Sequence, residues 1–266
     1  EARIGEGTLI GPNVLIEAGT IIGKNCKIFH GASLGGEPQI LNFKNVTASL
    51  EIGDETVVRE YVTIHRSGFK NGVTRVGSYC LLMANSHVGH DCEIGDGVVI
   101  VNSTALSGHV IVDDKAFISG LVGVHQFVRI GRYAMVGGMA RVNQDILPFS
   151  TVEGNPAKLY SVNAVGLKRA KFKPDIRVAI KKALKLDIKL KFIPFCYVPK
   201  EILEAEPTDG LWDDGRTDVK QLEMSYKELE DAIENSSNKN HKKYLEIRKR
   251  NLHKMKPIPV CKMKDD

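Results

Sequence analysis

The sequence has few aromatic side chains and no long apolar run. Aromatic residues make up 6% of the 266 residues, while the hydrophobic fraction is an ordinary 42%. No apolar run approaches the ~18 residues that a helix needs to cross a bilayer. No charged-then-apolar leader opens the chain. We therefore expect a globular protein that does not span a membrane.

The sequence also lacks paired cysteines. Five cysteines are scattered along the chain without a CxxC motif, which is typical of reduced thiols in the cytoplasm. The formal net charge is +5, which is weak evidence for an anionic ligand and no evidence for nucleic acid. We expect a cytoplasmic protein without a nucleic-acid partner.

What the sequence does contain is an internal repeat of six residues. Positions 4 to 142 in steps of six number 24, and all of them except Lys70 hold Ile, Leu or Val. Neither the helix period of 3.6 nor the strand period of 2 singles out every sixth residue. The repeat predicts short strands joined by tight turns, in which each strand forms one flat side of a prism and points its aliphatic residue inward.

The repeat also predicts the size of the prism. Three units close one coil of 18 residues, so 24 units predict eight coils stacked at the inter-strand spacing of ~4.8 Å. Residues 35–49 and 66–74 are rich in turn-forming residues, and we expect both to leave the prism as loops. The predicted fold class is mainly β: a parallel β-helix of hexapeptide repeats over residues 1–148, then a connector and basic helix over 149–186. A C-terminal α-helical tail is expected over 187–266.

An 18-residue coil brings polar residues of different repeats into columns. His90 is predicted to stack on Gly108, and Gly108 on Gln126, while Asp91 lies beside His109 one coil away. A histidine can take a hydroxyl proton, an unobstructed glycine N–H can stabilise an oxyanion, and an acid can orient the imidazole. This column favours acyl transfer. Zinc bound by histidines of neighbouring faces remains an alternative that the spacing does not exclude.

Several motifs together resemble the UDP-N-acetylglucosamine O-acyltransferases, which catalyse the first step of lipid A synthesis. They are REYVTIHRS, NSHVGHDC, LSGHVIVDD, GLVGVHQF, MVGG, VNQDILPFS, EGNPA and VNAVGLKRAKF, and they span residues 1 to about 185. The resemblance implies a left-handed β-helix in a cytoplasmic homotrimer. It also implies transfer of a 3-hydroxyacyl chain from acyl carrier protein to the 3-position of the sugar of UDP-N-acetylglucosamine, with no cofactor beyond the acyl carrier protein thioester and no metal.

The resemblance also implies roles for individual residues. His90 corresponds to the general base, Asp91 to its orienting acid and Gly108 to the oxyanion donor. The residues that correspond to contacts with the sugar nucleotide or the acyl group are His87, His109, His125, Gln126, Gly138, Asn163 and Arg169.

The sequence departs from the family pattern at three places. Ile40 stands where an acid is expected, Val165 breaks an Asn-x-Glu pattern, and Ala170 replaces a second arginine. An acceptor that carries a 3-amino group is therefore a further possibility. The other hypotheses are an acetyl-CoA-dependent hexapeptide-repeat acetyltransferase, a β-helical zinc hydratase, and an inactive fragment whose trimer fails.

The last part of the chain resembles a different enzyme. VPKEILEAEPTDGLWDDGRTD and the residues after it, from about 197 to 266, are similar to the C-terminal end of ammonia-dependent NAD synthetase. That enzyme needs an ATP-binding SGGxDS loop, which this sequence does not contain. We expect a fused fragment without synthetase chemistry.

Overall fold

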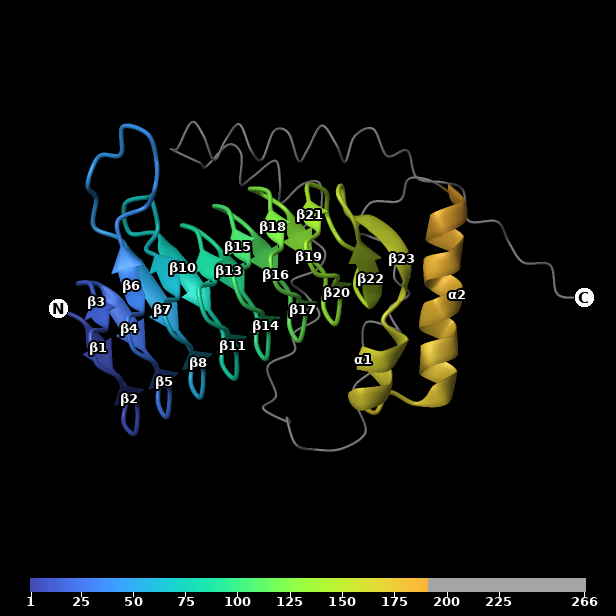
Figure 1. Cartoon of the computed structure of the whole chain (residues 1–266), viewed down its shortest axis with the longest axis horizontal. Helices are drawn as coiled ribbons and strands as arrows, with labels where there is room; N and C mark the ends of the chain where they lie inside the picture. Colours follow the sequence, from blue (N-terminus) through green and yellow to red (C-terminus); the bar gives the residue numbers. More distant parts are fainter. Residues whose placement is uncertain (191–266) are drawn as a thin grey trace, which may run out of the picture. The chain divides into compact units, whose positions relative to one another are not determined.

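The fold is a three-sided prism of short parallel strands. The computed structural model describes residues 1–190, and Figure 1 shows the strands stacked in order along the long axis. The first sheet contains β1 (Arg3–Ile4), β4 (Thr20–Ile22), β7 (Ser49–Ile52), β10 (Val73–Val76), β13 (Glu93–Ile94), β16 (Ile111–Val112) and β19 (Arg129–Ile130).

The other two sheets run beside the first. The second contains β2 (Leu9–Ile10), β5 (Lys27–Ile28), β8 (Val57–Val58), β11 (Leu81–Leu82), β14 (Val99–Ile100), β17 (Phe117–Ile118), β20 (Met135–Val136), β22 (Ser150–Glu153) and β23 (Lys158–Val162). The third contains β3 (Leu15–Ile16), β6 (Ser33–Gly36), β9 (Thr63–His65), β12 (His87–Val88), β15 (Ala105–Leu106), β18 (Gly123–Val124) and β21 (Arg141–Val142).

The aliphatic residues of the repeat form the core. Leu34, Ile64, Leu82, Ile100 and Leu106 have no exposed surface, and they belong to one continuous cluster that runs along the inside of the prism. Each fully buried aliphatic side chain stabilises the fold by about 1.5–3 kcal/mol relative to leaving it exposed. The predicted inward position of every sixth residue is confirmed from Ile22 onward, except within the two loops.

The predicted number of coils is wrong. Ile4 pairs with Ile22, as a regular coil of three units requires, but Ile22 pairs with Ile52 and Ile52 with Val76. The step to Ile52 contains two hexapeptide units more than a regular coil, and the step to Val76 contains one more. These three extra units lie in the two loops, so the prism has seven coils. Ile40, Val46 and Lys70 keep the spacing without forming strands, and Ile40 is 37% exposed.

One corner of the prism explains why glycine so often follows the aliphatic residue. Gly5, Gly23, Gly53, Gly77 and Gly95 occupy equivalent positions just after first-sheet strands. A Cβ at Gly95 would lie 2.8 Å from the backbone nitrogen of Asp114 in the next coil. At Gly95 the backbones of successive coils approach so closely that a side chain would force one of them to shift, whereas the equivalent position after β16 holds Asp113.

The C-terminal edge of the prism is covered by a hairpin and two helices. β22 pairs parallel with β20, and β23 pairs antiparallel with β22. α1 (Ala164–Arg169) and α2 (Pro174–Leu190) follow, and the rings of Tyr133, Phe149 and Phe172 pack together between prism and helices. The predicted basic helix is thus present, and residues 149–163, expected only as a connector, contain a hairpin that lengthens the second sheet.

The domain division at residues 148 and 186 stays a prediction. Residues Glu1–Leu184 form one compact unit, and the predicted tail lies outside the described residues from position 191 on. Neither α1 nor α2, within residues 1–190, has the length and apolar character that a bilayer crossing requires.

The close approach of coils at the glycine corner is testable with a matched pair of substitutions. Gly95→Ala should destabilise the protein by about 1–3 kcal/mol, the usual cost of forcing an extra carbon into a packed site. Gly123→Ala is the control, because a Cβ at Gly123 meets nothing within 4 Å. Thermal unfolding of both variants measures the difference. Equal melting temperatures would show that the corner has room for a side chain.

Candidate functional site

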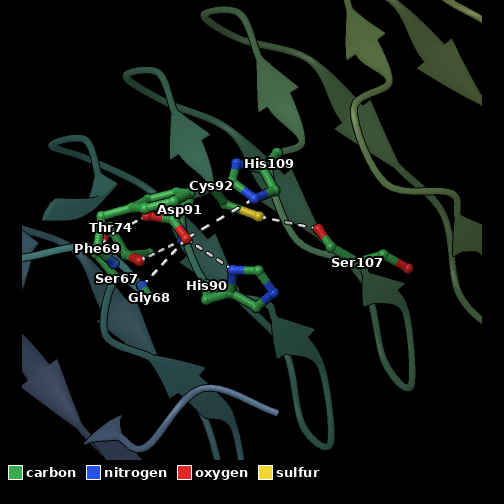
Figure 2. Close-up of polar contacts among 9 residues, drawn as sticks. All are labelled: Ser67, Gly68, Phe69, Thr74, His90, Asp91, Cys92, Ser107 and His109. Carbon is green, nitrogen blue, oxygen red and sulfur yellow. Dashed lines mark hydrogen bonds and ion pairs between the residues drawn. The ribbon is translucent and has the colours of Figure 1, made fainter. Parts of the chain in front are cut away.

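The centre of the site is a histidine–carboxylate pair at the corner after β12. Nδ1 of His90 lies 2.7 Å from Oδ2 of Asp91, and the two side chains are only 17% and 10% exposed. With Asp91 ionised, Nδ1 carries the hydrogen and donates it to the carboxylate, which leaves the lone pair on Nε2. Figure 2 shows Nε2 on the side of the ring that faces away from Asp91. The geometry therefore suits His90 to act as a base through Nε2.

Asp91 is held by the loop between β9 and β10. Ser67 Oγ donates to Oδ1 of Asp91, and the Gly68 N–H donates to Oδ2 across 3.1 Å. The Asp91 N–H donates to Oγ1 of the buried Thr74 across 2.8 Å. Burial alone would raise the pKa of Asp91, but hydrogen bonds from His90, Ser67 and Gly68 outweigh it and hold the pKa below its ordinary value. Asp91 thus stays a carboxylate at neutral pH.

Gly108 lies directly beside the edge of the His90 ring that carries Nε2 and Cε1. A Cβ at Gly108 would stand 2.6 Å from both Nε2 and Cε1 of the imidazole, so a side chain here would collide with the ring. No acceptor within residues 1–190 takes the Gly108 N–H. The predicted stacking of His90 on Gly108 is confirmed, and it places the imidazole next to a backbone N–H that has no acceptor among the described residues.

His109 and His87 line the same region. The His109 ring packs edge-on against His90 at 5.1 Å and stacks on Phe127 at 4.6 Å. His87 Nδ1 is hydrogen-bonded to Thr63 Oγ1 at 2.7 Å. Burial, and then the charge of His90, lower the pKa of His87. His87 is thus neutral at physiological pH, which suits a hydrogen-bonding role.

His65 packs against His87 with ring centroids 4.9 Å apart. Burial, followed by the charges of His87, His90 and Arg66, lowers its pKa to about 4.

Cys92, the residue after Asp91, has a buried thiol that donates to the carbonyl of Ser107. Desolvation raises the pKa of this thiol to about 12. It stays protonated and is not a nucleophile.

The remaining predicted site residues lie farther along the chain. His125 and Gln126 are exposed one coil after His109, and Nδ1 of His125 faces the carbonyl oxygen of Gln126 at 3.1 Å. Gly138 is exposed, and a Cβ there would make only ordinary contacts, the nearest at 3.5 Å.

Asn163 and Arg169 lie at the two ends of α1. Asn163 caps the helix, with Oδ1 accepting from the Gly166 N–H and Nδ2 donating to the Tyr133 carbonyl, each at 2.9 Å. Its polar atoms already have protein partners, so its structural role is plain, whereas its nucleotide contact stays a prediction. Arg169 is exposed in the last turn, beside Lys168.

Sequence reasoning missed the residues that hold Asp91 and His87. Ser67, Gly68 and Thr63 contact Asp91 and His87 across a sequence distance of 23 or 24 residues. An 18-residue period aligns His87 with Phe69 instead. The Lys70 break was the available signal, because it marks the six-residue insertion that shifts the register.

Three metal-ligating side chains also meet at this corner. One ligand atom each of His90, Asp91 and His109 lie within 4.8 Å of one another. The two carboxylate oxygens of Asp91 already accept from Ser67, Gly68 and His90. A metal ion would have to displace these donors, and it would occupy the imidazole that the geometry suits to accept a proton. The geometry favours proton transfer over metal binding.

Comparison with known proteins agrees with the fold and motifs. Residues 1–36 and 74–108 match the family described as bacterial transferase hexapeptide (six repeats), and residues 145–190 match Udp N-acetylglucosamine O-acyltransferase, Domain 2. Residues 171–265 match NAD synthase. The repeat and the stacked sheets thus define a hexapeptide-repeat transferase.

Solved structures show to which family of hexapeptide-repeat transferases the chain belongs. The UDP-N-acetylglucosamine acyltransferase of Bacteroides fragilis is 34% identical, with a TM-score of 0.68, and the match covers 77% of this chain and 91% of that chain. The UDP-N-acetylglucosamine acyltransferase of Francisella novicida is 32% identical, with a TM-score of 0.68, and the match covers 92% of this chain and 78% of that chain. The chain belongs to the UDP-N-acetylglucosamine acyltransferase family, and its fold is the left-handed parallel β-helix.

A curated relative shows how much of a whole enzyme is matched. The acyl-[acyl-carrier-protein]--UDP-N-acetylglucosamine O-acyltransferase of Gloeothece citriformis is 51% identical over 173 residues, which are 65% of this chain and 63% of that protein. The chain therefore spans less than two thirds of the length of this relative.

The purified protein should contain no stoichiometric zinc. The reason is that His90 and Asp91 are already committed to each other and to the loop that carries Ser67. Elemental analysis should give far less than one zinc per subunit, and chelators should leave activity intact. A ratio near one, with activity lost on chelation, would favour the hydratase hypothesis.

Proposed function

We propose that the protein transfers a 3-hydroxyacyl chain from acyl carrier protein to the 3-position of the sugar in UDP-N-acetylglucosamine, or in its 3-amino analogue. The observation that carries the proposal is the placement of His90 Nε2 beside Gly108, whose N–H has no acceptor within residues 1–190. The relatives' names, which specify this donor and this acceptor, support it. In this proposal the enzyme is a cytoplasmic homotrimer that uses the acyl carrier protein thioester and no further cofactor.

The reaction follows from the positions of these groups. The sugar 3-hydroxyl attacks the thioester carbonyl while Nε2 of His90 accepts its proton. The carbonyl oxygen becomes an oxyanion that the Gly108 N–H stabilises. The Asp91 carboxylate stabilises the imidazolium that has formed. The intermediate then expels the thiolate of acyl carrier protein, which takes the proton from His90, and the ester and the free thiol are released.

Contacts to the substrate come from the residues around this centre. His87 and His109 flank His90, and we assign them to the sugar and the acyl group. Lys168 and Arg169 end α1 with two exposed cations suited to a diphosphate. We assign His125, Gln126 and Gly138, which lie farther along the prism, to the acyl chain and its groove.

His90→Ala should lower kcat by at least the ~100-fold typical of a lost general base, while the melting temperature and oligomeric state remain unchanged. The measurement is formation of acylated UDP-sugar from a 3-hydroxyacyl-acyl carrier protein, run with the wild type in parallel. A folded His90→Ala variant with full activity would refute the proposed role, and a wild type that acylates neither acceptor would refute the proposed function.

The chain should not synthesise NAD, although residues 171–265 match NAD synthase. The reason is that the sequence contains no SGGxDS phosphate-binding loop. Incubation with deamido-NAD, ATP and ammonia should yield no NAD above a blank. Steady NAD formation by the purified chain would show that the C-terminal segment carries synthetase chemistry.

A further inference from the structure

A buried serine outside the assigned catalytic set controls the environment of Asp91. Ser67 has no exposed surface and lies in the six-residue insertion between β9 and β10. Its hydroxyl donates to Oδ1 of Asp91 and accepts the Phe69 N–H across 3.0 Å. A hydroxyl has a single hydrogen. Because Phe69 fixes the lone-pair side, that hydrogen points to the carboxylate.

The carboxylate of Asp91 is clamped through both oxygens. Ser67 bonds Oδ1, while the Gly68 N–H and His90 Nδ1 both bond Oδ2 (Figure 2). The backbone of Asp91 is also fixed, in a left-handed conformation with φ of 58° and with its N–H bonded to Thr74. Donors on separate oxygens fix the plane of the carboxylate, which in turn sets the direction of the His90 ring.

The loop that carries Ser67 is itself built into the structure. The Ser67 N–H donates to the Ser49 carbonyl across 3.3 Å, and the Asn71 N–H donates to the Thr47 carbonyl across 2.7 Å. A Cβ at Gly72 would overlap the Ser67 hydroxyl. The Ile40 side chain packs so close to Gly68 that a Cβ there would lie 2.5 Å from Ile40 Cδ1. The hydroxyl is therefore held in place and shielded from water.

We propose that Ser67 is a positioning residue of the acyltransferase, which acts through Asp91 to hold His90 in the orientation that general-base catalysis needs. The inference rests on the proposed function. Ser67 is fully buried and does not touch the substrate, so its loss acts on turnover and leaves substrate binding unchanged. Without it, Oδ1 of Asp91 is a buried charged oxygen that lacks its donor, an arrangement that drives the carboxylate to rotate.

Kinetics of a double-mutant cycle test the inference. Ser67→Ala should lower kcat by about tenfold, the effect expected from losing one hydrogen bond to a charged group, with KM for the sugar nucleotide within about twofold. In the Asp91→Ala background the same substitution should change kcat by less than about twofold, because the partner through which Ser67 acts is gone.

The control is Ser150→Ala. Ser150 is equally buried, and its hydroxyl donates to the Leu147 carbonyl across 2.7 Å, away from the catalytic pair. This variant should leave kcat within about twofold in both backgrounds. An equal fall in kcat for Ser67→Ala with and without Asp91 would mean that Ser67 acts only on the general fold, and would overturn the inference.

A crystal structure of Ser67→Ala gives an outcome that does not depend on activity. The His90 Nδ1–Asp91 Oδ2 separation, 2.7 Å with serine present, should lengthen beyond the hydrogen-bonding range or the His90 ring should turn, and neither should occur in Ser150→Ala. An unchanged pair in Ser67→Ala overturns the positioning role. Absence of acyl transfer by the wild type would sink the proposed function instead, while this comparison still decides the role of Ser67.

Discussion

The regular spacing of stacked coils is the constraint on which the rest of the structure depends. Each coil donates its backbone N–H groups to the next, so the strands of every sheet are locked at the parallel inter-strand distance. Aliphatic side chains fill the inside of each coil, and glycine is common where the backbones meet at the first-sheet corner. A residue on one coil therefore has defined neighbours on the coils before and after it.

This spacing explains how the proposed catalytic groups are brought together. His90 and Gly108 occupy equivalent positions on successive coils, and they meet for that reason. The prism supplies rigid positions, whereas the two loops supply what a regular coil does not. The shorter loop provides Ser67 and Gly68, whose hydrogen bonds keep Asp91 ionised despite its burial. The longer loop places Ile40 over Gly68. The proposed catalytic site thus depends on insertions into an otherwise uniform repeat.

The contrast between the regular coils and the two loops also decides which features can be predicted from the sequence. The six-residue period predicts the strands, the buried face and the His90–Gly108 column, because stacking follows from residue number alone. It fails where loops interrupt the count: Ile40 and Val46 match the period by coincidence, and counting them together with the unit at Lys70 predicts eight coils instead of seven. Ser67 was missed for the same reason. Family resemblance implies a nucleotide contact for Asn163, whereas the structure shows that it caps α1, a position that asparagine favours.

The central claim is that His90 Nε2 takes the proton from the acceptor group of the sugar. A crystal structure with UDP-N-acetylglucosamine bound measures this directly. The account predicts that the sugar 3-hydroxyl lies within about 3.2 Å of Nε2, the reach of a general base, and on the Gly108 side of the ring. A sugar nucleotide bound with another hydroxyl facing His90, or with the 3-hydroxyl beyond the reach of one bridging water, would contradict it.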